Sequence, residues 1–263
     1  MTTLFALLSI AMYLISMFVL MGRLFHKDGP NKTVALSLAA VGTVVHILYL
    51  ADAIMGVPGQ NMSITNVLSL VAWLITVSML ISITLLPNVM LLPGVLGFAA
   101  LSVTAVFIIP AEHIMHIELQ PGLLIHISLS LFAYGTLVIA FLYALQMSYI
   151  THRLKQKEAA FIYSTMPPLT LVEGILFKLL LVGTCLLIIA QISGFIFLDN
   201  MFSKLYAHKT LLSLAATAIY ILLLVGQRMW GWRGKQVIGL TVLGLALLSM
   251  AYFGSRFVRE ILL

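Results

Sequence analysis

Residues 173–198 read EGILFKLLLVGTCLLIIAQISGFIFL, an apolar run interrupted only near its start by Glu173 and Lys178. A helix that crosses a bilayer needs about 20 mostly apolar residues, because each residue adds about 1.5 Å along the axis. Working outward from this run, the chain offers eight such stretches. They are residues 4–22, 34–55, 64–86, 91–109, 122–149, 173–198, 209–229 and 236–256. The sequence therefore predicts an all-α integral membrane protein with eight transmembrane helices, organised as a single transmembrane domain over residues 1–263.

Composition excludes a soluble domain. Of the 263 residues, 62% are hydrophobic and 8% are charged, whereas soluble domains carry about 25% charged residues. The formal net charge of +6 does not indicate a nucleic-acid partner, because the basic residues lie in short clusters between apolar runs and form no continuous face. The expected partner is the lipid bilayer, and we expect no nucleic acid.

The distribution of lysine and arginine predicts the orientation, since cytoplasmic loops carry an excess of these residues. The odd-numbered loops hold nine of them and the opposite side holds four. This places both termini on the outer side of a bacterial inner membrane. The nine are Arg23, Lys27, Lys32, Arg153, Lys155, Lys157, Arg228, Arg233 and Lys235, and the four are Lys204, Lys209, Arg256 and Arg259.

The sequence lacks a cleavable signal peptide, a pair of cysteines and the common catalytic motifs. No basic segment or cleavage pattern marks the N-terminus as a removable signal peptide, so we expect a retained first helix. Cys185 is the only cysteine, which excludes an intrachain disulfide, and we expect it to be a small buried hydrophobe. No nucleotide-binding, zinc-protease or serine-hydrolase motif occurs, so we expect no catalytic residues.

Histidine is the residue type to follow, because neutral imidazole ligates haem iron and an ionisable group within a membrane is costly. Five of the seven histidines fall on the outer side or in the outer halves of the expected helices. His46 and His126 should lie below the lipid headgroups, where a binding site and a structural hydrogen bond between helices both remain open. The five are His46, His113, His116, His126 and His208.

The outer loop of residues 110–121 offers a second candidate site. His113 and His116 are three residues apart, a spacing that places two side chains on one face of a helix. Glu112 and Glu118 flank them. The sequence leaves open whether this is a divalent-cation site with His116 as a ligand or a solvated loop. Asp52 is six residues from His46, so no direct pair between them is expected.

Three segments together resemble the cytochrome c assembly (CcsA/CcmC/HemX-type) membrane proteins. Residues 121–134 read PGLLIHISLSLFAY and resemble the histidine-containing helix of that family. The second segment runs from QISGF at 191–195 to HKTLLSL at 208–214. The third is GWRGK at 231–235, followed by an apolar helix that ends in AYFG at 251–254. The resemblance covers nearly the whole chain and is closest to small members without a large extra domain.

The resemblance implies an eight-helix domain that handles haem b at the outer face. His126 matches a family haem-ligand histidine by its motif, and His46 is a candidate by position, with His208 as the alternative second ligand. Two departures are evident. The family's haem-delivering members carry a tryptophan-rich outer loop, but residues 199–208 read DNMFSKLYAH. Those members also tend to carry a second histidine in the helix before the Trp-Arg-Gly motif, and this sequence has Gln227 and no histidine there.

Two hypotheses therefore remain. In the first, the protein binds haem through outer-face histidines and takes part in haem handling or cytochrome c assembly. In the second, it is a non-haem accessory or regulatory subunit of another membrane protein, such as a cation transporter. A small-solute transporter ranks last, because the eight helices offer no evident inverted repeat.

Overall fold

The computed structural model describes residues 2–24, 26, 29–56, 58–85, 89–109, 112–116, 120–156, 167–198, 202 and 207–254. The basic residues Lys27, Lys157, Lys204, Arg256 and Arg259 lie outside these ranges, as do the acidic residues Glu118 and Asp199. Within them the chain forms helices and one short two-stranded sheet. It divides into two compact units, called unit 1 and unit 2 below.

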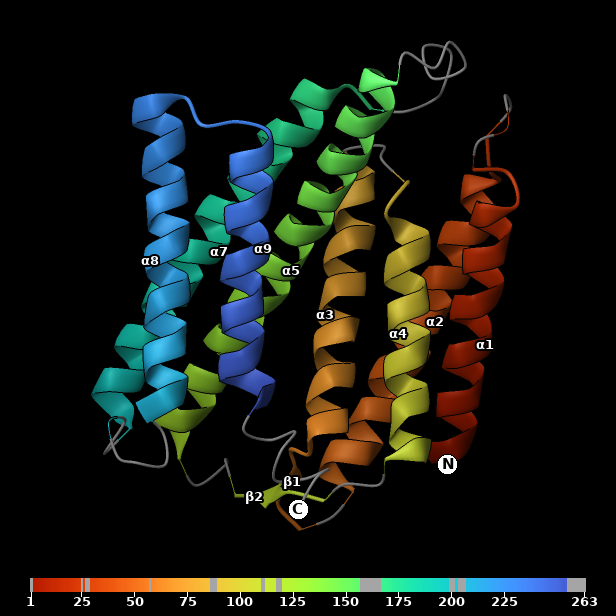
Figure 1. The fold of residues 1–263 in the computed structure, drawn as a ribbon. Helices are drawn as coiled ribbons and strands as arrows, with labels where there is room; N and C mark the ends of the chain where they lie inside the picture. The colour runs from red at the N-terminus through yellow and green to blue at the C-terminus, as the bar shows by residue number, and fades with distance from the viewer. Residues whose placement is uncertain are drawn as a thin grey trace. The chain divides into compact units, whose positions relative to one another are not determined.

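Unit 1 contains the first four helices. These are α1 (Thr2–Met21), α2 (Lys32–Met55), α3 (Ile64–Leu85) and α4 (Leu92–Ile108). Helix α1 packs on α2 and α4, and α3 also packs on both, so the four helices form a closed ring of neighbours. Strand β1 (Gln60–Asn61) pairs antiparallel with β2 (Ile114–Met115) beside the end of α2 and the start of α3 (Figure 1).

Unit 2 contains α5 (Pro121–Lys155), α7 (Leu169–Phe197), α8 (Ala207–Trp230) and α9 (Lys235–Ser249). A π-helical turn, Met250–Gly254, continues α9. Helices α7 and α9 each pack on both α5 and α8, so α5 and α8 lie across from each other in a second ring of four. Close packing of α5 on α7 depends on Gly183, where a β-carbon would lie 2.8 Å from the Leu137 side chain.

The helices bear out the prediction of an all-α membrane protein, and each of the eight expected stretches forms a helix. Seven of the described helices are long and apolar enough to cross a membrane. Helix α4 is apolar but has only 17 residues. Local signals explain several helix ends. The Asn31 side chain accepts a hydrogen bond from the Val34 amide at 3.2 Å and caps α2, and Pro121 occupies the first turn of α5.

Two details differ from the sequence-based expectations. Cys185 is exposed on α7, so the expectation of a small buried hydrophobe was wrong. An apolar run within a membrane gives no reliable sign of which face turns inward, because lipid accepts apolar side chains as readily as a protein core does. Helix α5 extends to Lys155, six residues beyond the apolar stretch, because Arg153 and Lys155 are good helix formers that solvent accepts.

Candidate functional site

His126 is held by α7 through one of its two ring nitrogens. Its Nδ1 atom lies 2.9 Å from the carbonyl oxygen of Ala190. A carbonyl oxygen only accepts, so Nδ1 carries the proton and donates, and Nε2 keeps its lone pair. No partner for Nε2 occurs among the described residues. This is the arrangement of a metal-ligating histidine, whose second nitrogen is oriented by a backbone or side-chain acceptor.

The sequence near His126 explains how the imidazole reaches α7. Pro121 starts the helix and Gly122 follows, against the ring of Phe197. A β-carbon at position 122 would lie 2.6 Å from that ring, so only glycine allows the approach. Ser193 donates to the Ala190 carbonyl at 2.7 Å and lies 3.4 Å from the His126 Nδ1. The start of α5 is thus fixed against the last turns of α7.

Further polar side chains form hydrogen bonds between the helices of unit 2. Gln191 of α7 donates from Nε2 to Thr217 Oγ1 of α8 at 2.7 Å. The Tyr134 hydroxyl of α5 lies 2.9 Å from Ser249 Oγ, and the Tyr134 ring lies 5.2 Å from that of Tyr252. All four helices therefore contribute hydrogen-bonding side chains to this interior, as in bundles that build ligand sites from facing helices.

His208 is the second histidine of unit 2 in the expected set. It is the second residue of α8 and is exposed. Helix α5 begins, α7 ends and α8 begins at the same end of unit 2 (Figure 1), so His126 and His208 both belong to that end. They stand on helices that lie across from each other in the ring.

His46 lies in unit 1 and is completely buried, with 0% of its surface exposed. Its Nδ1 atom is 3.1 Å from the Tyr13 hydroxyl, and its Nε2 atom is 2.9 Å from Ser69 Oγ. The ring therefore connects α2 to both α1 and α3. In this arrangement both nitrogens have protein partners, and the geometry is that of a structural hydrogen bond between helices.

Asp52 and His46 do not meet, as the sequence spacing predicted. Asp52 instead accepts a hydrogen bond from the Thr2 hydroxyl, which joins the start of α1 to the last turn of α2. Tyr13, Ser69 and Thr2 were not identified from the sequence. Tyr13 and Ser69 are polar residues within expected transmembrane stretches, which is the available signal, but their partners follow only from the packing of the helices.

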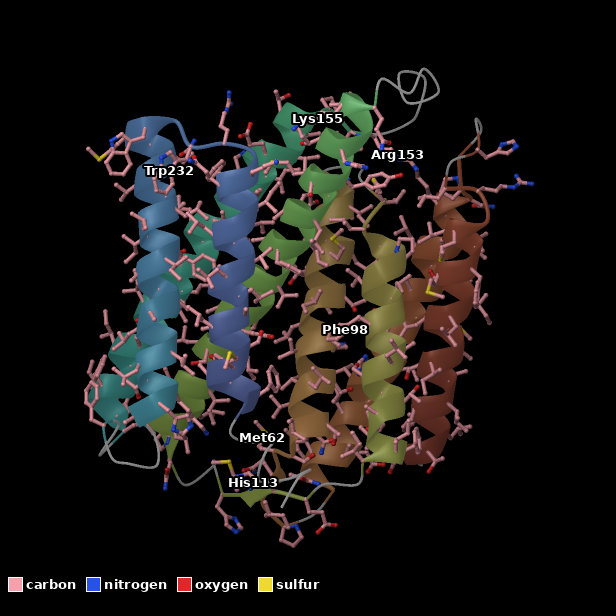
Figure 2. The ribbon with its side chains drawn as sticks, in the orientation of Figure 1. Met62, Phe98, His113, Arg153, Lys155 and Trp232 are labelled. Carbon is pink, nitrogen blue, oxygen red and sulfur yellow. The ribbon has the colours of Figure 1, made fainter. Side chains whose placement is uncertain are left out.

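The loop with His113 and His116 forms part of the small sheet and is not helical. The His113 amide donates to Asn61 Oδ1 at 3.0 Å, and the Met62 amide donates to the His113 carbonyl at 2.8 Å (Figure 2). Residues 114 and 115 form β2 between the two histidines, so the shared helical face does not exist. Among the described residues, no group of three or more His, Cys, Asp or Glu side chains is placed to hold a metal ion.

The Gly231–Lys235 segment makes a tight connection between α8 and α9. Gly231 and Gly234 have φ values of 64° and 62°, a region that strongly favours glycine. Arg233 Nε lies 3.2 Å from Glu173 Oε1 at the start of α7. The Trp230 and Trp232 rings stack at 5.6 Å. Trp232 lies at the same end of unit 2 as Arg153 and Lys155 (Figure 2), as expected for interfacial anchors beside a basic cluster.

The long apolar helices define the class of protein: it is an all-α multi-pass membrane protein. The chain belongs to the cytochrome c assembly protein family, whose model matches residues 34–263. It is 39% identical over 260 residues to the inner membrane protein YpjD of Escherichia coli strain K12, a match that covers 98% of each chain. YpjD proteins of Escherichia coli O6:H1 and O157:H7 match equally well. No solved structure matches this chain.

These matches confirm the resemblance inferred from the three sequence segments. They also bear out the prediction of a multi-pass inner-membrane protein, since the relatives are inner membrane proteins of nearly the same length.

Proposed function

We propose that this protein handles haem, binding haem b at the outer face of the inner membrane with His126 as an axial ligand. One observation carries the proposal. His126 donates from Nδ1 to the Ala190 carbonyl, and this leaves Nε2 without a partner among the described residues. When bound, haem would supply the iron and its redox chemistry. The protein would supply ligands, orientation and a bundle interior that shields the group.

For the second ligand we propose His208. It belongs to the same unit and the same end as His126, and its exposed side chain leaves it free to reorient. His46 was the other candidate, and both of its nitrogens already have protein partners. Ligation by His46 would leave the hydroxyl of Tyr13 or Ser69 without its imidazole partner inside a membrane, at a cost in free energy.

We propose further that all eight helices cross the membrane and that both termini lie on the outer side. Nine lysine and arginine residues in the odd-numbered loops against four on the other side support this orientation. Helix α4 would be the short span. Its 17 residues correspond to about 25 Å at 1.5 Å per residue, which is within the reach of a slightly thinned bilayer.

The test is the optical spectrum of the protein purified in mild detergent, oxidised and then reduced. We expect a Soret band that disappears in His126→Ala. The matched control is His152→Ala, on the opposite end of the same helix, which should leave the band unchanged. An unaltered Soret band in His126→Ala overturns the ligand assignment, and a wild-type protein that stays colourless after haem addition overturns haem binding.

A second function is favoured by one observation, the absence of tryptophan from residues 199–208. In this proposal the fold serves as a non-haem accessory or regulatory subunit of another membrane protein, such as a cation transporter. The purified protein would then be colourless and would keep a stable partner in mild-detergent pulldown. A colourless preparation with no reproducible partner would count against this second proposal.

A further inference from the structure

The connection between α8 and α9 carries three exposed basic side chains. Arg228 lies in the last turn of α8, Arg233 lies in the connection itself, and Lys235 begins α9. Arg233 pairs with Glu173 at the start of α7. Arg228 and Lys235 have no ion-pair partner among the described residues. Residues 228–235, called the basic segment below, therefore keep a net positive charge.

Arg228 stands at the end of a row of exposed apolar side chains on α8. Ile221 and Val225 precede it at a spacing that places all three residues on one face of the helix. Both apolar side chains are exposed. Helix α8 is long and apolar enough to cross a membrane, so its exposed apolar side chains face lipid. Arg228 therefore lies where this lipid-facing row reaches the membrane surface.

Lys235 has the same relation to α9. Gly239, Val242 and Ala246 follow it at helical spacing and lie on the same face of the helix. All three are exposed, and a β-carbon added at Gly239 would meet nothing within 4 Å. This face of α9 is thus open to lipid below Lys235. Because α8 and α9 pack against each other, two lipid-facing rows end at one basic segment.

Two tryptophans place the basic segment at the level of the lipid headgroups. The exposed ring of Trp230 stacks on that of Trp232, with the ring centroids 5.6 Å apart. Indole side chains concentrate at the interface between hydrocarbon and headgroups, because the ring is apolar and its N–H needs an acceptor. Trp232 belongs to the end of unit 2 that also carries Arg153 and Lys155 (Figure 2). The basic side chains of this segment therefore lie at the depth of lipid phosphates.

Charge and apolar surface together decide which molecule fits here. A lipid phosphate is an anionic acceptor, which is the partner that Arg228 and Lys235 lack. Arg233 turns Nε toward Glu173, and its side chain is 74% exposed, so other guanidinium N–H groups remain for an acceptor. A soluble anion would match these charges but would not cover the apolar rows. A phospholipid with a net negative charge matches both, whereas a zwitterionic one brings its own cation.

We propose that the basic segment selects anionic phospholipid from the surrounding membrane, with phosphates at Arg228 and Lys235 and acyl chains along the exposed rows of α8 and α9. Attraction of this kind enriches anionic lipid by about fivefold for each basic residue near the membrane surface. By the proposed orientation, the selected lipid belongs to the cytoplasmic leaflet. The selection does not depend on haem, so it would hold equally in a colourless protein.

The test measures quenching of tryptophan fluorescence by lipids brominated near the start of their acyl chains. The intact protein is reconstituted into phosphatidylcholine vesicles with a small share of phosphatidylglycerol. The bromine is carried either by the phosphatidylglycerol or by an equal share of the phosphatidylcholine. Two of the three tryptophans lie in the basic segment, so we expect several-fold stronger quenching by phosphatidylglycerol. Equal quenching overturns the proposal. Absence of quenching when all the lipid is brominated means that another molecule covers the segment, and it overturns the proposal too.

The double variant Arg228→Gln/Lys235→Gln keeps both reporter tryptophans and should lose most of the preference for phosphatidylglycerol. Its matched control is Arg23→Gln/Lys32→Gln, which removes the same charge from exposed positions of unit 1 and should keep the preference. An equal loss in the control would assign the attraction to total charge and overturn local selection.

If the double variant does not fold, Lys235→Gln alone should lower the preference by about fivefold. An unchanged preference in a folded variant overturns the proposal.

Discussion

The indole ring of Trp232 packs directly on the backbone of Gly226, six residues earlier in the chain. A β-carbon at position 226 would lie 2.3 Å from a ring atom, closer than any two non-bonded carbons approach. The Trp232 amide also donates to the Gly226 carbonyl at 3.2 Å. The connection between α8 and α9 is thus folded back on the last turns of α8, and residue 226 has no room for a side chain.

Gly226→Ala should therefore destabilise unit 2. Overpacking of this kind costs about 1–3 kcal/mol. Gly239→Ala is the matched control, because position 239 lies in α9 with nothing within 4 Å of an added β-carbon. Alanine there should stabilise the helix by up to about 1 kcal/mol. Thermal unfolding followed by intrinsic fluorescence checks both, and equal midpoints for the two variants would contradict the packing described.

Ser69→Ala should destabilise unit 1 more than Ser102→Ala. Ser69 Oγ meets His46 on another helix, whereas Ser102 Oγ donates only to the Ala99 carbonyl of its own helix at 2.8 Å. Both serines are buried, so the difference isolates the contact between helices. We expect a difference of about 0.5–1.5 kcal/mol, since the buried imidazole nitrogen loses its partner. Denaturant titration in a fixed detergent measures it, and no difference would show that the contact carries no stability.

If haem binds as proposed, with His126 and His208 as ligands, His208→Ala should change its coordination and His46→Ala should not. With His208 as the second axial ligand, its loss leaves the Soret band but replaces the resolved α and β bands of low-spin iron with a high-spin spectrum. His46→Ala should keep the low-spin spectrum while lowering the unfolding midpoint, because it breaks contacts to α1 and α3. The reverse pattern would reassign the second ligand to His46.

Glu173→Gln should have a small effect on stability. Glu173 is 13% exposed, but its partner Arg233 is 74% exposed and remains hydrated when the pair is broken. Partly exposed ion pairs contribute at most about 1 kcal/mol. Lys178→Gln, on the same helix and exposed, is the control and should be neutral. Raising the salt concentration should shrink the difference between the two variants, and a difference that does not respond to salt would argue against an ionic contribution.

Reporter fusions test whether α4 crosses the membrane. A fusion after Met90 precedes α4 and one after His116 follows it. Alkaline phosphatase, active only outside, should be inactive at the first position and active at the second. A green fluorescent protein should give the opposite pattern. Activity at both positions or at neither would mean that α4 does not span. Fusions after Gln156 and after Gly254 test the inner and outer ends of unit 2.

Most helix ends were predictable from the sequence to within about two residues, the end of α5 and the start of α7 excepted, and the partners of the polar residues were not. Apolar length and turn residues such as Asn31 and Pro121 fix where a spanning helix begins, because both are local properties. His46 and His126 stand out locally for the same reason, as ionisable residues in apolar runs. Their roles depend on Ser69 and Ala190, which are distant in sequence, and only packing brings these residues together.

The environment of Cys185 and the conformation between His113 and His116 both depend on contacts that the local sequence does not encode. Cys185 was expected inside, but lipid and protein interior favour the same residue types, so the sequence of α7 does not distinguish its faces. His113 and His116 were considered on a helical spacing, but the segment between them pairs with residues 60 and 61. The partner strand lies more than 50 residues earlier in the chain, so the local sequence around His113 does not indicate the pairing.

The exposure of Cys185 gives the protein a built-in attachment point for a reporter group. It is the only thiol in the chain and lies near the middle of a 29-residue helix, so one spin label or fluorophore can be placed without removing or adding a cysteine. Quenchers that differ in membrane depth would then read the position of α7 in the bilayer directly. A partner subunit that covers this face of α7 would reveal itself as protection of the label from lipid-dissolved oxygen.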